Sequence, residues 1–125
     1  MFADASTANA IDTQALLTRC MNNVSFSLAL LGELEATGEQ RVHEIAGHVA
    51  AGDCALAAEA AHSLKGSAGI LFAEPLRAIT AEIESAGKSG DLGRISSLVD
   101  DLRREMTLCL AAACRYREQS AAAQS

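Results

Sequence analysis

Residues 61–71 read AHSLKGSAGIL, and the spacing of their side chains decides which element they form. A helix turns by about 100° per residue, so residues that recur every three or four positions share one face. Counted from Asp53, this spacing gives one buried stripe that consists of Leu56, Ala60, Leu64, Ser67 and Leu71, with Ala57 and Ala68 beside it. His62 lies roughly opposite this stripe. The stretch therefore predicts a helix that buries its leucines and exposes its histidine.

Small residues surround His62 on this predicted helix. Ala58, Gly66 and Gly69 lie at positions i−4, i+4 and i+7, and Lys65 at i+3 is the only cation within side-chain reach. Glycine inside a helix costs about 1 kcal/mol relative to alanine, so two glycines on an exposed face need another explanation. Close approach of a second molecule to the histidine supplies one.

Length and composition favour a single helical domain. The chain has 125 residues, enough for one hydrophobic core and too few for two ordinary ones. Half of the residues are apolar, but only 3% are aromatic and one is proline. Such a composition suits close-packed helices better than a sheet, which favours β-branched and aromatic residues. The formal charge of −6 argues against nucleic acid as a partner, because that binding relies on Lys and Arg.

The cysteines and the N-terminus indicate a cytoplasmic protein. The spacings of Cys20, Cys54, Cys109 and Cys114 match neither a C-x-x-C pair nor a zinc knuckle, which favours free thiols in a reducing compartment. Residues 1–10 lack the basic flank and apolar run of a secretory signal. No run of eighteen apolar residues occurs, so we expect no transmembrane helix and no membrane partner.

The first half of the chain predicts a short helix and a long one. Asp12 or Thr13 can cap a short helix that stops at 22–23 and covers the core like a lid. Apolar residues then keep a helical phase from Val24 to Val49. Because the phase continues across Gly38, one helix over 23–51 is preferred to two helices broken there, although Gly38 could equally be a C-terminal cap.

The second half predicts three more helices. Gly52 ends one helix and Asp53 caps the next, which runs to about Phe72, and residues 73–75 form a connection. Helical stripes then recur over 76–89 and, after a cap at Asp91, to about Glu118. The predicted fold is an all-α, antiparallel up-down four-helix bundle with a short additional N-terminal helix. It spans residues 11–118 between a flexible N-terminus, 1–10, and a flexible tail, 119–125.

The residues around His62 do not form a self-sufficient catalytic site. A nucleophile would need an adjacent base, and a metal site would need three or four converging ligands. Glu59, at i−3, is the only nearby acid on the same helix, and His43 and His48 are five residues apart and share no face. A neutral imidazole beside Lys65 can instead attack an activated phosphoryl group. We therefore expect no enzyme, no bound metal and no cofactor of the chain's own.

These residues resemble a known family. The run from Ala61 to Ala68, preceded by Gly52-Asp53 and followed by Ile83-Glu84 and 90–92, is similar to the histidine-containing phosphotransfer (HPt) domain of bacterial two-component phosphorelays. The resemblance covers residues 11–117 and rests on the H-x-L-K-G motif. Family members often have glycine shortly after this motif, whereas this chain has Phe72.

The resemblance implies a role for each motif residue. His62 would be the phosphoacceptor, Lys65 would support the phosphoryl group, and Gly66 would keep the approach open. The partner would be a receiver domain of a response regulator or a hybrid histidine kinase, which would bring Mg²⁺ and an aspartate. The helical wheel adds an expected docking surface made of Ala55, Ala58, Glu59, Gly69 and Ile70. We expect the chain to be a monomer.

Three alternatives stay open at this level. The chain could be the phosphorylatable N-terminal domain of a chemotaxis-type kinase, although it has no ATP-binding segment. It could be a helical adaptor or dimerisation module in which His62 is incidental, and a His62→Gln variant would separate this class from a phosphocarrier. A metal-binding bundle is the weakest alternative, and a zinc titration without stoichiometric uptake would exclude it.

Overall fold

The computed structural model describes residues 9–124, and helices account for nearly all of this range. No β-strand occurs among these residues. The helices are α2 (Thr13–Arg19), α3 (Val24–Ala50), α4 (Cys54–Ile70), α5 (Glu74–Lys88) and α6 (Leu92–Gln124). The predicted all-α class is confirmed.

Side-chain caps begin four of these helices, and the three aspartates among them lie at the positions that the sequence predicts. In each cap a side-chain oxygen accepts a hydrogen bond of 3.0 Å from the backbone N–H three residues later. The capping residues are Asp12, Asn23, Asp53 and Asp91. Gly52 and Gly90 follow α3 and α5 with φ of +75° and +74°, a conformation that glycine adopts at little cost. These caps and glycines fix the short turns that make successive helices antiparallel.

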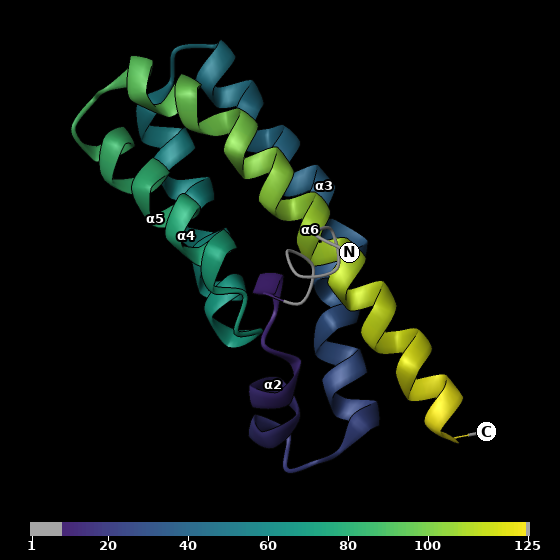
Figure 1. The fold of residues 1–125 in the computed structure, drawn as a ribbon. Helices are drawn as coiled ribbons and strands as arrows, with labels where there is room; N and C mark the ends of the chain where they lie inside the picture. The colour runs from purple at the N-terminus through teal and green to yellow at the C-terminus, as the bar shows by residue number, and fades with distance from the viewer. Residues whose placement is uncertain (1–8, 125) are drawn as a thin grey trace.

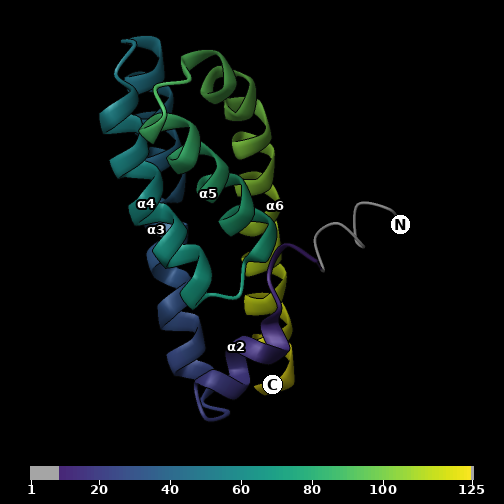
Figure 2. The same cartoon turned by 90° about the vertical axis from the view of Figure 1, so that its left-hand side faces the viewer.

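The four long helices form the bundle, and α3 is continuous through Gly38. Helices α3 and α6 lie side by side along most of their length, with the shorter α4 and α5 packed against one half of them (Figures 1 and 2). A side chain at Gly38 would put its Cβ 2.7 Å from Met106 Sδ on α6. Gly38 therefore permits a close approach of α3 to α6, and the prediction of one long helix is confirmed.

Aliphatic side chains fill the centre of the bundle. The largest fully buried apolar ones come from every helix and from the segment before α2: Ile11, Leu16, Leu31, Ile45, Leu64, Leu76, Ile83, Ile95, Leu102 and Met106. Helix α2 packs on α3 near its start, and Leu16 is completely buried, as a lid on the core requires. Burying each large aliphatic side chain stabilises the fold by about 1.5–3 kcal/mol.

The turn between α4 and α5 differs from the prediction. Helix α4 ends at Ile70, two residues before the predicted Phe72, and Glu74 and Pro75 belong to the first turn of α5. Phe72 has a positive φ of 56°, which is unusual for an aromatic residue. Its carbonyl accepts a 2.9 Å hydrogen bond from the Asp12 N–H, and the Arg19 guanidinium lies 5.0 Å from its ring centroid. Helix α2 thus holds the turn in place.

The predicted ends of the bundle also need correction. Helix α6 continues to Gln124, through the segment predicted as a flexible tail after Glu118. The reason is local, because alanines 121–123 favour helix and no glycine or proline interrupts them. Most of the predicted flexible N-terminus lies outside the described residues, but its last residue, Ala10, is buried and its carbonyl accepts a 3.7 Å contact from Cys109 Sγ.

None of the helices in the described part of the chain has the length and hydrophobicity of a membrane span. All four cysteines are free thiols, as predicted, with Cys20 and Cys109 buried. Burial raises the pKa of the Cys109 thiol to about 12, so it stays protonated and packs as a small apolar group.

Candidate functional site

His62 lies in the middle of α4, and its imidazole is held from one side only. The side chain is 68% exposed, as the sequence predicts. Its Nδ1 atom is 2.7 Å from Oε2 of Glu84 on α5, whose side chain is only 7% exposed. A buried carboxylate therefore anchors an exposed imidazole across the α4–α5 interface.

Glu84 also binds two lysines. Lys65 Nζ, one turn beyond His62, lies 2.6 Å from Oε1, and Lys88 Nζ on α5 lies 3.1 Å from Oε2. The hydrogen bond from Lys65 is the largest cause that lowers the pKa of Glu84 to about 2, and Lys88 and His62 lower it further, against the opposing effect of burial. Glu84 is therefore ionised at any physiological pH.

This ionised carboxylate determines the tautomer of the imidazole. A carboxylate without a proton can only accept hydrogen bonds, so His62 Nδ1 must be the donor in the 2.7 Å contact. In the neutral ring the second nitrogen, Nε2, then has no proton and a free lone pair. The geometry thus presents one nucleophilic nitrogen on an exposed side chain.

The space around His62 is open. A Cβ atom built on Gly66 would meet no atom within 4 Å, and one built on Gly69 would meet only Arg77 Cδ, at 3.9 Å. On the other side, a shallow depression between α4 and α5 is lined by Ala55, Ala58, Glu59, His62, Glu84, Gly87 and Lys88. Because Gly66 and Gly69 have no side chains, a reacting group on another protein can reach the ring over this part of α4.

A known family model matches the part of the chain that contains this site. The model of the Hpt domain matches residues 29–115, a range that contains α4, α5, the His62–Glu84 contact and both lysines. The chain belongs to the Hpt domain family. Membership supports a histidine phosphotransfer role in a phosphorelay and confirms the resemblance predicted from the H-x-L-K-G motif.

Two solved structures share the fold of this Hpt domain. Histidine-containing phosphotransfer protein B (HptB) from Pseudomonas aeruginosa PAO1 is 23% identical, with a TM-score of 0.81 over 88% of this chain and 96% of that one. The HPT domain of an Hpt sensor hybrid histidine kinase from Shewanella is 20% identical, with a TM-score of 0.78 over 89% and 96%. At these identities the likeness concerns the fold. No curated protein matches the chain.

The residues predicted to surround His62 occupy different environments in the Hpt domain. Ala55 and Glu59 are exposed, Ile70 is half exposed, and Gly69 is partly buried. Ala58 is only 5% exposed, because it packs against Gly87 of α5, although it still lines the depression beside His62. Its assignment to the docking surface stays a prediction.

The buried face of α4 is rotated relative to the predicted stripe. Leu56 is 43% exposed and Ala60 is partly buried, whereas Ala58 and Ala61 join Leu64 in the buried face. The rotation follows from close packing of α4 on α5, which small alanines allow. His62 consequently lies at the edge of the α4–α5 interface and can reach Glu84.

The sequence alone did not predict two residues of the site, Glu84 and Lys88. Both belong to α5, so the pattern of residues around the axis of α4 could not indicate them. The short turn offered a signal, because His62 and Glu84 each lie eleven residues from Ala73 and therefore face each other in an antiparallel pair. An acid next to the buried Ile83, at that distance from the turn, is a candidate partner for the histidine.

The remaining candidate ligands do not converge. Within residues 9–124, no group of three or more His, Cys, Asp or Glu side chains could hold a metal ion. His43 is exposed and His48 is partly buried, both on α3. That the chain binds no metal stays a prediction, which a zinc titration would test.

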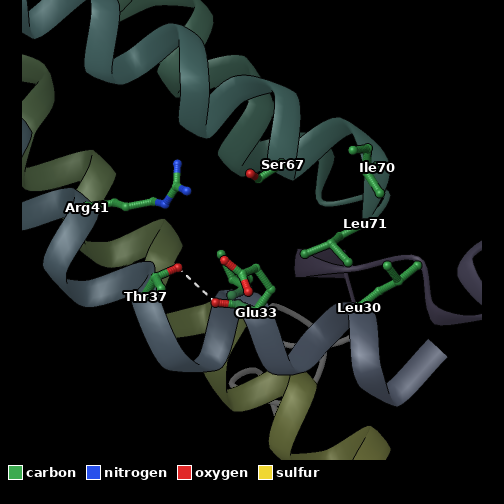
Figure 3. A pocket seen from close by; sticks show the side chains of 8 residues that line it. Leu30, Glu33, Thr37, Arg41, Ser67, Ile70 and Leu71 are labelled. Carbon is green, nitrogen blue, oxygen red and sulfur yellow. Dashed lines mark hydrogen bonds between the residues drawn. The ribbon is translucent and has the colours of Figure 1, made fainter. Parts of the chain in front are cut away.

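A mostly apolar groove runs between α3 and α4, on the other side of α4 from Glu84. It has a volume of about 120 Å³. Figure 3 shows its lining on α3, which is Leu30, Glu33, Thr37 and Arg41, across from Ser67 and Ile70 of α4 and Leu71 directly after it. Arg41 donates a 2.9 Å hydrogen bond to Ser63 Oγ at one end. At the other end, Ile70 is 50% exposed.

Proposed function

We propose that this Hpt domain is a phosphocarrier that takes a phosphoryl group on Nε2 of His62 and passes it to a receiver aspartate. The donor is the aspartyl phosphate of another receiver, or a kinase. The observation that carries the proposal is the Glu84 contact, which holds the proton on Nδ1, so that the free lone pair of the neutral, exposed ring is on Nε2. Membership of the Hpt family supports the same role.

The transfer step needs no proton movement on His62. The Nε2 lone pair attacks phosphorus, a nitrogen–phosphorus bond forms, and the bond from phosphorus to the aspartate oxygen breaks with its electron pair returning to the carboxylate. Because Nδ1 keeps its proton, the phosphorylated ring carries a positive charge, which Glu84 stabilises from 2.7 Å. The reverse step restores the neutral ring, so the same geometry serves donation and acceptance.

Two lysines are suited to support the phosphoryl group. Lys65 is the cation that the sequence predicts for this role, and its side chain is 31% exposed. Lys88 is 71% exposed and reaches the same carboxylate, so it can turn to a phosphoryl oxygen at little cost. We propose that both share their charge between Glu84 and the phosphoryl group, while Gly66 leaves the approach open.

The partner supplies the remaining chemistry in this proposal. We infer that the receiver domain holds the Mg²⁺ and the second acceptor, and that the Hpt domain acts in the cytoplasm as a monomeric carrier and not as an enzyme. Such a division of labour suits phosphoryl transfer, because its loose transition state needs mainly positioning and positive charge.

Incubation with a phosphorylated receiver domain and Mg²⁺ tests the carrier role. We expect the purified chain to gain one phosphoryl group by intact mass, and the modification to be labile in acid, stable in alkali, and located at His62 by peptide mapping. Absence of any gain with a panel of receivers and kinases would contradict the proposal and favour a helical adaptor.

We further propose that the receiver docks on the side of α4 that faces α3. The surface runs from His62 over Gly66 and Ile70 to the groove between the two helices. Its apolar walls, with the exposed Ile70 at one end, suit a transient contact with an apolar helix face. Glu59 and Ala55, from the predicted docking set, extend the surface along α4.

Ile70→Lys is expected to weaken receiver binding at least about tenfold, because a charge replaces an apolar contact at the interface. The fold should be unaffected, since Ile70 is half exposed and a cation is favourable at the C-terminus of α4. Titration calorimetry measures the affinity. Ala111→Lys, which adds the same charge on the exposed face of α6, is the control, and equal affinities for the two variants would contradict this docking surface.

A further inference from the structure

Gly87 makes the closest contact between α4 and α5 among the described glycines. A Cβ atom at this position would lie 2.7 Å from Ala58 Cβ and 2.8 Å from the backbone oxygen of Cys54. Non-bonded carbon atoms approach one another to about 3.5–4.0 Å, so a methyl group at Gly87 overlaps α4 by about 1 Å. The absence of a side chain at Gly87 is therefore a requirement of the present helix spacing.

This contact lies one turn away from the His62–Glu84 hydrogen bond. Gly87 follows Glu84 by three residues on α5, and Ala58 precedes His62 by four residues on α4, so each pair shares a helix face. The separation of the helix backbones at Gly87 and Ala58 consequently sets how far Glu84 must reach. A hydrogen bond of 2.7 Å leaves little margin, since such bonds are lost beyond about 3.2 Å.

Helix stability does not explain this glycine. In a helix, glycine costs about 1 kcal/mol relative to alanine, and Gly87 lies inside α5 with one further helical residue, Lys88, after it. Its φ is not in the left-handed region, so no turn geometry requires it. What it does provide is the close approach to Ala58.

We propose that Gly87 is a positioning residue: by letting α5 approach α4, it places the Glu84 carboxylate where it holds the Nδ1–H tautomer of His62. The inference rests on the proposed function for its effect on phosphoryl transfer, but not for its effect on the tautomer. A methyl group at this position forces the helices apart where Cys54 and Ala58 present backbone atoms that cannot rotate away.

Gly87→Ala tests the proposal on the unphosphorylated chain alone. Nitrogen-15 NMR of the imidazole reads the tautomer directly, and we expect the wild type to be mainly in the Nδ1–H form and the variant to be a mixture. Phosphoryl uptake from a receiver should slow by about tenfold to a hundredfold, as displacements of about 1 Å near a reacting group do. Gly47→Ala is the matched control, because this glycine lies near the end of α3 with no atom within 4 Å of its Cβ position.

A swap variant, Ala58→Gly with Gly87→Ala, separates helix spacing from other effects. It removes the 2.7 Å methyl–methyl contact and keeps the 2.8 Å contact with Cys54, so the Nδ1–H population should lie between those of wild type and Gly87→Ala. If Gly87→Ala does not fold, the swap is compared with Gly47→Ala, and an intermediate population still supports the proposal. A folded Gly87→Ala or swap variant with a wild-type tautomer overturns it. Failure of the carrier role would instead abolish uptake in the wild type while leaving the tautomer unchanged.

Discussion

His62→Gln is expected to take up no phosphoryl group from any receiver, while the helical content of the chain stays that of the wild type. Glutamine can occupy the exposed site and still hydrogen-bond to Glu84, but its amide nitrogen has no lone pair that attacks phosphorus. Intact-mass measurement after incubation with a phosphorylated receiver and Mg²⁺ gives the first result, and circular dichroism gives the second.

The fold should tolerate this change for a physical reason. The His62 side chain is 68% exposed, and Glu84 keeps its two lysines when the imidazole is removed. We expect the free energy of unfolding to change by less than about 1.5 kcal/mol, the contribution of one hydrogen bond.

His43→Gln is the matched control, because His43 is exposed on α3 and outside the site. It should take up the phosphoryl group like the wild type. Uptake by His62→Gln at the wild-type level would place the acceptor elsewhere, and loss in both variants would show that the assay reads stability and not the acceptor.

The parts of the fold that were predictable are those in which the signal is local. The aspartate caps, the glycines after α3 and α5, and the helical phase across Gly38 all depend on neighbouring residues, and the structure confirms them. The exposure of His62 was predictable too, although the buried face of α4 was not placed correctly. The reason is that α4 contains many alanines, which are only weakly hydrophobic and occur on several faces of the helix. The sequence of α4 alone therefore does not specify the buried face, and packing against α5 determines it.

The site was only half predictable because it is made between helices. The motif contributes His62, Lys65 and Gly66 from α4. Glu84 and Lys88 come from α5, and the positions that bring them to His62 depend on the α4–α5 separation, which no pattern within one helix specifies. The sequence thus located the exposed histidine, whereas the structure identified the carboxylate that accepts the hydrogen bond from its Nδ1 atom.

Replacing that group, in Glu84→Gln, is expected to slow phosphoryl uptake by about tenfold to a hundredfold without removing the acceptor. The neutral amide can present either its oxygen or its nitrogen to Nδ1, so it no longer enforces one tautomer. It also fails to stabilise the positive ring of the phosphorylated state. Glu39→Gln, which removes the same charge from an exposed position on α3 outside the site and the docking surface, is the control and should transfer at the wild-type rate.

The pH dependence of stability gives an independent measurement on the same variant. Glu84 has its pKa lowered from 4.5 to about 2 in the folded chain, mainly by Lys65 and then by Lys88 and His62. A lowered pKa means that the carboxylate stabilises the fold above about pH 4.5 and that this contribution disappears as the pH falls towards 2. At neutral pH, Glu84→Gln should therefore lower the free energy of unfolding by about 1 kcal/mol, since its cationic partners are partly exposed to solvent.

Urea unfolding between pH 7 and pH 2 tests this expectation directly. The difference between the free energies of unfolding of the wild type and Glu84→Gln should shrink as the pH falls from 4.5 to about 2. Glu39→Gln is measured over the same pH range as the control. A difference that stays constant over this range would mean that Glu84 stabilises the α4–α5 interface by packing alone. Lys65, Lys88 and His62 would then give the ionised carboxylate no stabilisation beyond that of the unfolded chain, and the lowered pKa of Glu84 would be wrong.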